Sequence, residues 1–450
     1  MVVGKEKGHA EGALGGAPGR VAVVGGGIAG LASAYFLARG GARVTVLEAS
    51  DAFGGLGGTF PYRDVHLERF YHCILPTDQE LLALLDALGL TEELYWHGTS
   101  FAVHTGGRLY PMNHPRDVLG FRALSLLDRL RLGVTGLFAR LSPPRGLDDI
   151  TCEAWLGRLS GKRAFSLLWR PLLEAKFGDH YREVPALWFW TRFNRDKGAG
   201  GEVKGYVRGG YRRITETLVA ALKRGGHVLR LQAPVKALDL DEGGRPRLRV
   251  AQGDWETFDR LVFTAPLPYL RGIAGDGRLA GVLAGLGEDV DMVGVLNAVF
   301  MLRRSLSPHY WIAATEAGSP FQGVVETTNL IDRGDIADAH LVYALRYLHR
   351  SDAWFAAADE LVLDASFTGL QRLFPELEAG DVLARHVFRT PFVEPIYTLG
   401  YLSRRPPNEL VPGRIYLATT TQVYPGVTSW NASVGLAGRV VAGLLGGARA

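Results

Sequence analysis

The residues with the clearest chemical use are three glycines and one glutamate near the start of the chain. Gly25, Gly27 and Gly30 form the pattern G-x-G-x-x-G, and Glu48 follows about twenty residues later. In this pattern the first glycine permits a tight turn, the second lets the backbone approach a pyrophosphate, and the third lets a helix pack closely on a strand. The pattern predicts a dinucleotide site in which Glu48 accepts hydrogen bonds from ribose hydroxyls and would repel a 2′-phosphate.

The elements that must position these residues lie on both sides of them. Residues 21–24 form a short apolar run typical of a buried strand, residues 31–39 have a helical pattern, and residues 43–47 form a second strand that ends at Glu48. A helix that begins at the glycine turn directs unpaired N–H groups and the positive end of its dipole at phosphates. A lone glycine pattern is weak, and the order strand, turn, helix, strand and acid makes it specific.

A second run of glycines follows Glu48. Four of the five residues from Gly54 to Gly58 are glycines, and Leu56 is the exception. Ordering so many glycines is entropically expensive. We therefore interpret the run as a loop whose backbone passes close to the ligand, rather than as a flexible linker.

From Glu48 onward the sequence resembles the flavin-dependent amine oxidase superfamily, which includes protoporphyrinogen oxidases, phytoene desaturases and, more distantly, UDP-galactopyranose mutases. In that family an acid followed by a Gly-Gly pair lets the chain cross under the pyrophosphate and ribose of FAD, and Gly54-Gly55 match the pair. Members often carry arginine next, where this chain has Leu56. The resemblance implies a mixed α/β fold with a Rossmann-like FAD-binding domain of the GR2 type, discontinuous in sequence, and an inserted substrate domain of mixed sheet and helices.

Two later regions carry the same resemblance. Val235 matches a valine that contacts the adenine end of FAD, and residues 261–266 (LVFTAP) match a buried strand that ends in a small-residue turn. Residues 417–431 are similar to the C-terminal flavin motif, in which a strand delivers an acid to the ribityl chain and a helix N-terminus faces flavin O2. Thr420 or Thr421 replaces that acid, and we expect Asn431 to begin the helix as its N-cap. The expected cofactor-binding residues are Gly25, Gly27, Ile28, Ala29, Gly30, Glu48, Ala49, Gly54, Gly55, Leu56, Gly57, Val235, Thr264, Ala265, Thr420, Thr421, Ser429 and Asn431.

Three residues are candidates for the catalytic site. His72 falls where the mutases have a histidine-containing loop that touches the flavin, although a purely structural histidine is the alternative. Tyr397 and Tyr424 are candidates for an aromatic wall, and a role in the core is the alternative for both. Segments 169–179 and 183–186 resemble a helix and loop that border the substrate cavity. We find neither metal-ligand spacing nor a Ser–His–Asp grouping, and the lysine that many amine oxidases place near flavin N5 is not identifiable.

The 450 residues are too many for one simple core, so we expect two intertwined domains. Residues 1–19 are expected to be a disordered leader. The FAD-binding domain is assigned to residues 20–73, 205–268 and 406–450, and the substrate domain to residues 74–204 and 269–405. Further elements are expected as helices over 78–88, 118–141 and 431–445, a mostly helical stretch over 150–221, and strands over 100–110, 226–240, 290–302, 339–348 and 414–420.

Charge and composition limit the partners. The net charge is +4, but residues 157–213 hold thirteen Lys/Arg against five Asp/Glu. This stretch is either a solvated basic face or an attraction for an anionic substrate such as a nucleotide sugar. No nucleic-acid-binding motif accompanies it. Two cysteines cannot form a disulfide framework, and we expect a reducing, cytoplasmic location.

The apolar stretch 118–141 also carries four arginines. We favour packing inside a helical substrate domain over a peripheral contact with a membrane surface. The oligomeric state is left open.

The leading hypothesis is an FAD-dependent oxidoreductase. Hydride would pass from a C–H bond of a small organic substrate, anionic if the basic stretch attracts it, to flavin N5. Oxygen or another acceptor would reoxidise the flavin, because no second fingerprint for NAD(P)H is present. The alternatives are a mutase that uses reduced flavin on a nucleotide sugar without net redox, and a flavin-binding partner protein without chemistry of its own.

Overall fold

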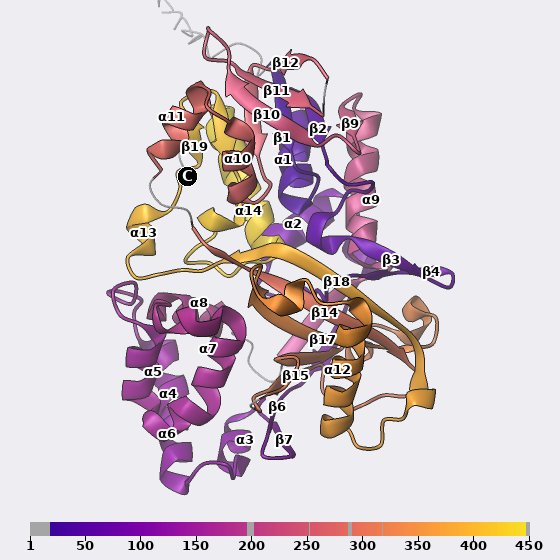
Figure 1. Cartoon of the computed structure of the whole chain (residues 1–450), viewed down its shortest axis with the longest axis vertical. Coiled ribbons are helices and arrows are strands. Elements are labelled where there is room, and N and C mark those ends of the chain that lie inside the picture. The colour runs from indigo at the N-terminus through magenta and orange to yellow at the C-terminus, as the bar shows by residue number, and fades with distance from the viewer. Residues whose placement is uncertain (1–18, 196–201, 252, 287–289, 317, 447–450) are drawn as a thin grey trace, which may run out of the picture.

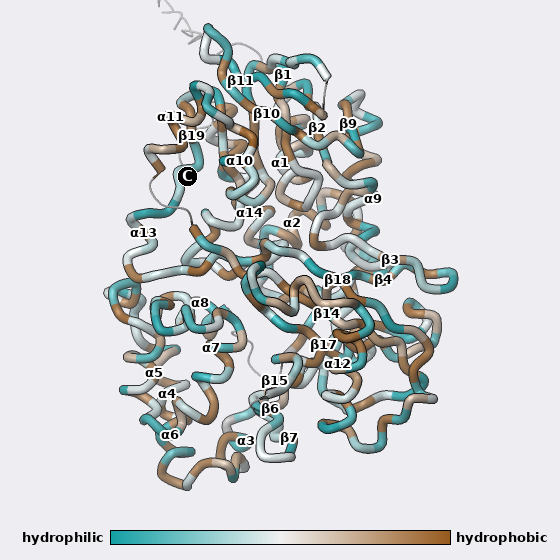
Figure 2. Tube along the Cα trace, in the orientation of Figure 1, coloured by the Kyte–Doolittle hydropathy of each residue, from teal (hydrophilic) through white to brown (hydrophobic). Residues whose placement is uncertain are grey.

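The computed structural model describes residues 19–195, 202–251, 253–286, 290–316 and 318–446 (Figure 1). The expected disordered leader, except for Gly19, lies outside the described residues. Three groups of elements surround the middle of the molecule: a sheet with helices at the top of Figure 1, a second sheet at the lower right, and a helical lobe at the lower left. Hydrophobic residues follow the strands inside the lobes, and hydrophilic residues are common in the outer turns (Figure 2).

The upper sheet has six strands in the order β19-β20-β13-β1-β2-β9. The strands are β1 (Arg20–Val24), β2 (Arg43–Leu47), β9 (Val228–Arg230), β13 (Arg260–Phe263), β19 (Glu409–Val411) and β20 (Ile415–Leu417). β1 pairs in parallel with β2 on one side and β13 on the other. The chain order reverses at β1, and in open parallel sheets ligands bind outside the carboxyl ends of the strands at such a point. The mixed α/β fold predicted from the sequence is confirmed.

The alternation of side chains along β1 explains how both faces of this sheet are covered. Val21 and Val23 pack with the helices of one face, and Ala22 and Val24 pack with the small sheet and helices of the other. The first face carries α1 (Ile28–Arg39), α2 (Gln79–Ala87), α9 (Gly210–Arg224) and α14 (Trp430–Leu444). The second carries β10 (Val235–Leu240), β11 (Pro246–Val250), β12 (Trp255–Thr257), α10 (Leu267–Ala274) and α11 (Arg278–Ala284).

The lower sheet has seven strands in the order β18-β14-β17-β16-β15-β6-β7. They are β6 (Phe101–Thr105), β7 (Arg108–Pro111), β14 (Met292–Leu302), β15 (Trp311–Ala314), β16 (Gly323–Glu326), β17 (His340–His349) and β18 (Val382–Pro395). Every residue of β14 is buried. One face of the sheet packs on α12 (Asp359–Leu373), and the other joins the core of the upper lobe. The long strand β18 crosses the middle of the molecule (Figure 1).

The helical lobe differs from expectation in one element. Its helices are α3 (Pro115–Gly120), α4 (Leu126–Leu141), α5 (Cys152–Ser160), α6 (Lys162–Ala164), α7 (Arg170–Phe177) and α8 (Ala186–Arg195). The single helix predicted over 118–141 is wrong because the chain breaks between α3 and α4. Ser125 caps α4, and its Oγ accepts a hydrogen bond of 3.2 Å from the N–H of Asp128.

The remaining elements connect the lobes. They are β3 (Thr59–Tyr62), β4 (Val65–Glu68), β5 (Leu94–Thr99), β8 (Glu202–Val207) and α13 (Tyr401–Arg404). The antiparallel pair β5–β8 spans the boundary drawn at residue 205. The domain boundaries stay a prediction, although all six strands of the upper sheet come from the three segments assigned to the cofactor domain.

Candidate functional site

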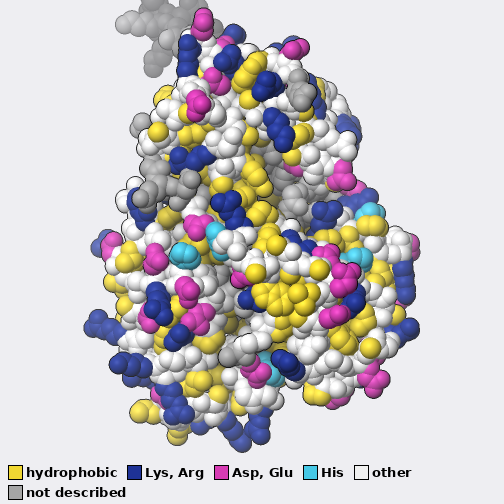
Figure 3. Space-filling view, in the orientation of Figure 1, with side chains coloured by type: hydrophobic (Ala, Val, Ile, Leu, Met, Phe, Trp, Pro, Cys, Tyr) yellow, Lys and Arg dark blue, Asp and Glu magenta, His cyan; other side chains and the backbone are white. Residues whose placement is uncertain are grey.

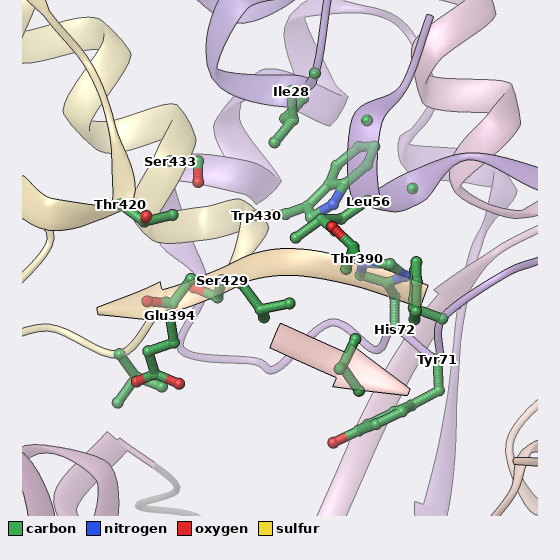
Figure 4. A pocket seen from close by; sticks show the side chains of 18 of the residues that line it. Ile28, Leu56, Tyr71, His72, Thr390, Glu394, Thr420, Ser429, Trp430 and Ser433 are labelled. Carbon is green, nitrogen blue, oxygen red and sulfur yellow. The ribbon is translucent and has the colours of Figure 1, made fainter. Parts of the chain in front are cut away.

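A large cavity lies where the three lobes meet. Its volume is 2490 Å³, against about 300–1,000 Å³ for a typical pocket that holds one small ligand. The walls come from the glycine turn, the second glycine run, the start of α14, the end of β18 and the helical lobe. Figure 4 shows Tyr71 and His72 on one side of this cavity and Glu394, Thr420 and Ser429 on the other. The space is sufficient for an extended dinucleotide and a substrate together.

The glycine turn is built as the sequence predicts. Gly25 has φ of +109°, and a Cβ on Gly30 would lie 1.9 Å from the carbonyl oxygen of Gly25. Gly27 has more space around it than Gly30, because a Cβ there would meet only the Cα of Gly55, at 3.8 Å. Gly27, Ile28 and Ala29 line the cavity, and Gly30 lies behind them. The N-terminus of α1 therefore borders an open cradle, and this cradle fits a pyrophosphate.

The second glycine run is ordered against the first. Gly54 has φ of +127°, and its N–H donates to the carbonyl oxygen of Gly26 at 2.9 Å. A Cβ on Gly55 would lie 3.1 Å from the Cα of Gly27, so the two backbones nearly touch. Leu56 lies on the cavity wall, where the family often has arginine (Figure 4). The wall therefore lacks a cationic contact at this point.

Glu48 and Ala49 lie on the wall at the end of β2. The Glu48 carboxylate accepts hydrogen bonds from the N–H of Gly26 at 2.6 Å and from the N–H and Oγ of Ser50 at 2.9 and 2.8 Å. These bonds fix its orientation. Its two oxygens together offer about four lone-pair sites, so capacity for ribose hydroxyls remains.

Three more of the expected cofactor-binding residues reach the cavity. Val235, Thr264 and Ala265 line it. The Thr264 hydroxyl donates to the carbonyl oxygen of Val24 at 3.0 Å, which ties the end of β13 to the end of β1. The strand ends at the switch point are thus held together beside the cradle.

The start of α14 corrects one expectation and decides between two others. Ser429, rather than Asn431, is the N-cap, because its Oγ accepts from the N–H of Ala432 at 3.1 Å. Asn431 instead accepts a bond of 3.0 Å from the N–H of Leu81 and does not line the cavity. Thr420 lines the cavity, whereas Thr421 is fully buried and bonded to Thr419 at 2.6 Å. Of the two threonines, only Thr420 is placed to contact a ligand.

The structure divides the three catalytic candidates. His72 lines the cavity, with its ring centroid 4.7 Å from that of Tyr211 and 5.9 Å from that of Trp430. Burial lowers the pKa of His72 to about 4, against a weaker opposing effect of a backbone hydrogen bond at Phe70. The side chain is therefore neutral at pH 7.

Tyr397 and Tyr424 do not line the cavity, so the aromatic wall expected from them is wrong. Both are fully buried in the core of the helical lobe, and their ring centroids lie 4.7 Å apart. The Tyr424 hydroxyl donates to Asp148. These side chains support the wall from behind, where aromatic packing stabilises them.

The wall holds an ion pair that sequence reasoning did not single out. Lys176 of α7 pairs with Glu394 of β18, whose other carboxylate oxygen accepts from Trp188 Nε1 at 3.1 Å. Glu394 is 2% exposed. The Lys176 ammonium also lies 4.0 Å from the ring centroid of Tyr347. Lys176 falls inside segment 169–179, which resembles a cavity border, and that was the only signal for it.

Aromatic side chains cover the rest of this region. Burial raises the pKa of both the Tyr71 and the Tyr347 hydroxyl, and the neighbouring Tyr347 raises that of Tyr71 further. The phenols therefore stay protonated. Trp188, Trp311 and Phe388 extend the same wall. An aromatic environment of this kind surrounds the Lys176–Glu394 ion pair.

The charge of the cavity is predominantly positive. Ten Lys/Arg and five Asp/Glu line it. Three of the acids are already paired with cavity cations, namely Glu394 with Lys176, Asp78 with Arg195 and Glu216 with Arg212. In the described part of the chain, no group of His, Cys, Asp and Glu is arranged to hold a metal ion.

Comparison with known proteins agrees with this geometry. The family model described as flavin containing amine oxidoreductase matches residues 28–429. The putrescine oxidase of Kocuria rosea is 31% identical over 248 residues, 48% of each chain. The 15-cis-phytoene desaturase of Synechococcus elongatus is 24% identical over 395 residues, which cover 81% of this chain and 82% of the relative. The chain spans about half the length of the amine oxidase relatives it matches.

Among solved structures, a reduced UDP-galactopyranose mutase superimposes with a TM-score of 0.76 at 15% identity, over 96% of both chains. At this identity the likeness shows the fold alone.

Proposed function

This chain belongs to the family of flavin-containing amine oxidoreductases, and from that premise we propose an FAD-dependent oxidoreductase that acts on a C–H bond of a small, largely apolar organic substrate. One observation carries the proposal. The N-termini of α1 and α14, the glycine cradle and the aromatic wall all face a single cavity. Bound FAD would accept a hydride at N5 and pass two electrons on to oxygen or another acceptor.

The residues of the chain would divide the work of binding. Gly27 and the α1 N-terminus would hold the pyrophosphate, and Glu48 would hold a ribose. The α14 N-terminus, capped by Ser429, would stabilise negative charge that develops on the flavin ring. Thr420 would contact the ribityl chain in place of the family's acid.

The wall opposite would bind the substrate. Tyr71 and Tyr347 would exclude water from the reacting carbon. Lys176 Nζ, held by Glu394, is placed to donate a hydrogen bond or transfer a proton to a polar group of the substrate. Because most of the acids in the cavity are already paired, the site favours a neutral or anionic substrate over a protonated amine.

Spectroscopy tests the proposal. The purified protein is expected to show an oxidised flavin spectrum, which Glu48→Ala should weaken by lowering flavin content. After photoreduction, reoxidation in air within seconds would identify an oxidase, and a flavin that stays reduced for minutes would identify a dehydrogenase. Failure to retain flavin after incubation with excess FAD would refute the proposal.

A second candidate function is a mutase that uses reduced flavin on a nucleotide sugar, without net redox. The excess of cavity cations favours it, because they would attract a diphosphate. It predicts turnover of a nucleotide sugar only after reduction with dithionite. Turnover by the oxidised enzyme would exclude it.

A further inference from the structure

Helix α4 exposes its most apolar face. Seven large hydrophobic side chains of this one helix lie open to solvent: Leu126 (59% exposed), Leu127 (74%), Leu130 (52%), Val134 (65%), Leu137 (60%), Phe138 (48%) and Leu141 (76%). At about 100° per residue they fall within an arc of about 120°. They form one continuous stripe, which we call the α4 stripe. Contiguous apolar patches of this kind mark interaction sites.

The buried face of the same helix is less apolar than the exposed one. Leu132, Thr135 and Ala139 are the buried residues of α4, and they lie on the side opposite the α4 stripe. A surface helix in a globular protein normally has the reverse arrangement. Our expectation that segment 118–141 packs inside the substrate domain therefore holds for Phe121, Leu124 and Leu132, which are buried in a hydrophobic core cluster, and is wrong for the α4 stripe. The leucines of the α4 stripe, unlike Leu132, are not part of the core of the lobe.

Basic side chains flank the stripe. Arg131 follows one side of the arc and Arg140 the other, and both are exposed. The Arg131 guanidinium also donates to the carbonyl oxygens of Leu159 and Arg158, at 3.0 and 2.9 Å. From Pro115 to Leu141 the chain holds five arginines and two aspartates. Both aspartates are used locally, because Asp117 accepts from the N–H groups of Asn113 and His114, and Asp128 accepts from Ser125. Figure 3 shows Lys and Arg along the lower left rim of the helical lobe, next to hydrophobic patches.

The stripe adjoins the cavity. Leu137 is 60% exposed and also lines the cavity, as do Gly133, Gly136 and Arg140 of the same helix. The cavity thus reaches the surface at α4. An apolar molecule held at the stripe would have a short apolar route inward.

We propose that α4 is a docking surface for an anionic lipid bilayer. The α4 stripe enters the boundary between headgroups and acyl chains, while the flanking arginines bind lipid phosphates. The charge pattern favours lipid over a second copy of the chain, because two copies would bring their arginines together. In the part of the chain that the structure describes, no helix is long and apolar enough to cross a bilayer, so the contact is peripheral.

Vesicle sedimentation of the full chain with its bound flavin tests this inference. The protein should sediment with phosphatidylcholine vesicles that contain phosphatidylglycerol, and less with phosphatidylcholine alone. Leu127→Asp/Leu141→Asp should weaken binding by about tenfold or more. The matched control is Leu361→Asp on α12, where the leucine is 57% exposed, and it should bind like the wild type. Arg116→Ser/Arg122→Ser, which removes two exposed arginines from the stretch that leads into α4, should reduce the preference for phosphatidylglycerol.

Three results would overturn the inference. The first is that the wild type stays in the supernatant when the anionic vesicles sediment. The second is that Leu361→Asp weakens binding as much as the double variant does. The third is a dimer in light scattering that Leu127→Asp/Leu141→Asp converts to a monomer, which would make the stripe a contact between copies. An unchanged flavin spectrum and circular dichroism spectrum establish that each variant is folded. Because binding to vesicles requires no turnover, the outcome is independent of the proposed function.

Discussion

Removing the ammonium of Lys176 gives a sharp test of how the substrate wall is built. In Lys176→Met the side chain keeps its length and its contact with Tyr347, but Glu394 loses its charged partner. The Glu394 side chain is 3% exposed and that of Lys176 is 20% exposed. After the change, the buried carboxylate keeps the hydrogen bond from Trp188 but has lost the ammonium group that neutralised it.

The magnitude follows from this asymmetry of burial. Breaking a buried ion pair by removing one partner costs about 3–5 kcal/mol, because an uncompensated charge remains. The cavity gives water some access to the pair, so we expect Lys176→Met to lower the free energy of unfolding by about 3 kcal/mol. Glu394→Gln should cost less, about 1–2 kcal/mol, because the remaining lysine is more exposed and keeps its contact with the aromatic ring. The double variant should be less destabilised than the sum of the two, with a coupling of about 2 kcal/mol.

Urea unfolding at saturating FAD measures these differences. The matched control is Arg170→Met, which removes an exposed pair with Glu174 on the same helix, and it should cost about 0.5 kcal/mol or less. If Lys176→Met costs no more than Arg170→Met, the pair is not buried as the structure shows it. Stopped-flow flavin reduction adds a second readout. Lys176→Met should retain FAD but slow reduction by substrate, and equal rates would remove Lys176 from the proposed chemistry.

Three further predictions concern the cofactor side of the cavity. Gly30→Ala should prevent folding or flavin retention, because its Cβ would lie 1.9 Å from a carbonyl oxygen. Gly27→Ala should fold normally, as circular dichroism would show, but it should lose FAD affinity because its Cβ enters the cradle. Because the pKa of His72 is depressed in the folded state, the unfolded chain binds a proton first as the pH falls. The free energy of unfolding should therefore drop by up to about 3 kcal/mol as the pH falls from about 6.5 through 4. The urea midpoints of His72→Asn should show less of this loss. Thr420→Asp should slow FAD dissociation, whereas Thr421→Asp should unfold the protein by placing a charge at a fully buried position; equal effects in the two variants would contradict the assignment of Thr420 to the cavity.

The residues on the cofactor side of the cavity could be predicted from the sequence because their signal is local. The turn at Gly25 to Gly30 needs only the strand before it and the helix after it, and these constraints appear in consecutive residues. The sequence could not decide between Thr420 and Thr421, because both hydroxyls suit a ligand. Only the short helical turn over Thr420–Gln422 determines which of them faces the cavity.

The substrate wall of the cavity depends on contacts between segments that are distant in the sequence. Trp188 and Glu394 are separated by 206 positions in the sequence, and no local pattern brings them together. Tyr424 looked like a wall residue because a tyrosine can serve in a core or in a cavity, and only tertiary packing decides between them. The prediction that the leucines of α4 pack inside the protein was wrong for a related reason. A helical apolar periodicity indicates that one face will be covered, but it does not say whether protein or another surface covers it.

Because the upper lobe is built from segments that are far apart in the sequence, a bound dinucleotide would have a structural role as well as a chemical one. Ala29, Val235 and Ser429 line the same cavity, although they come from three segments that are far apart in the sequence. A dinucleotide that contacts all three binds the folded state and has no comparable site in the unfolded chain. It therefore stabilises the association of these segments by mass action. The effect reaches the substrate wall too, because the core of the upper lobe continues into the lower sheet through residues such as Val295 and Tyr343. This coupling is why the Lys176 variants must be compared at saturating FAD: at partial saturation, a change in flavin occupancy would shift the unfolding midpoint and be mistaken for the loss of the ion pair.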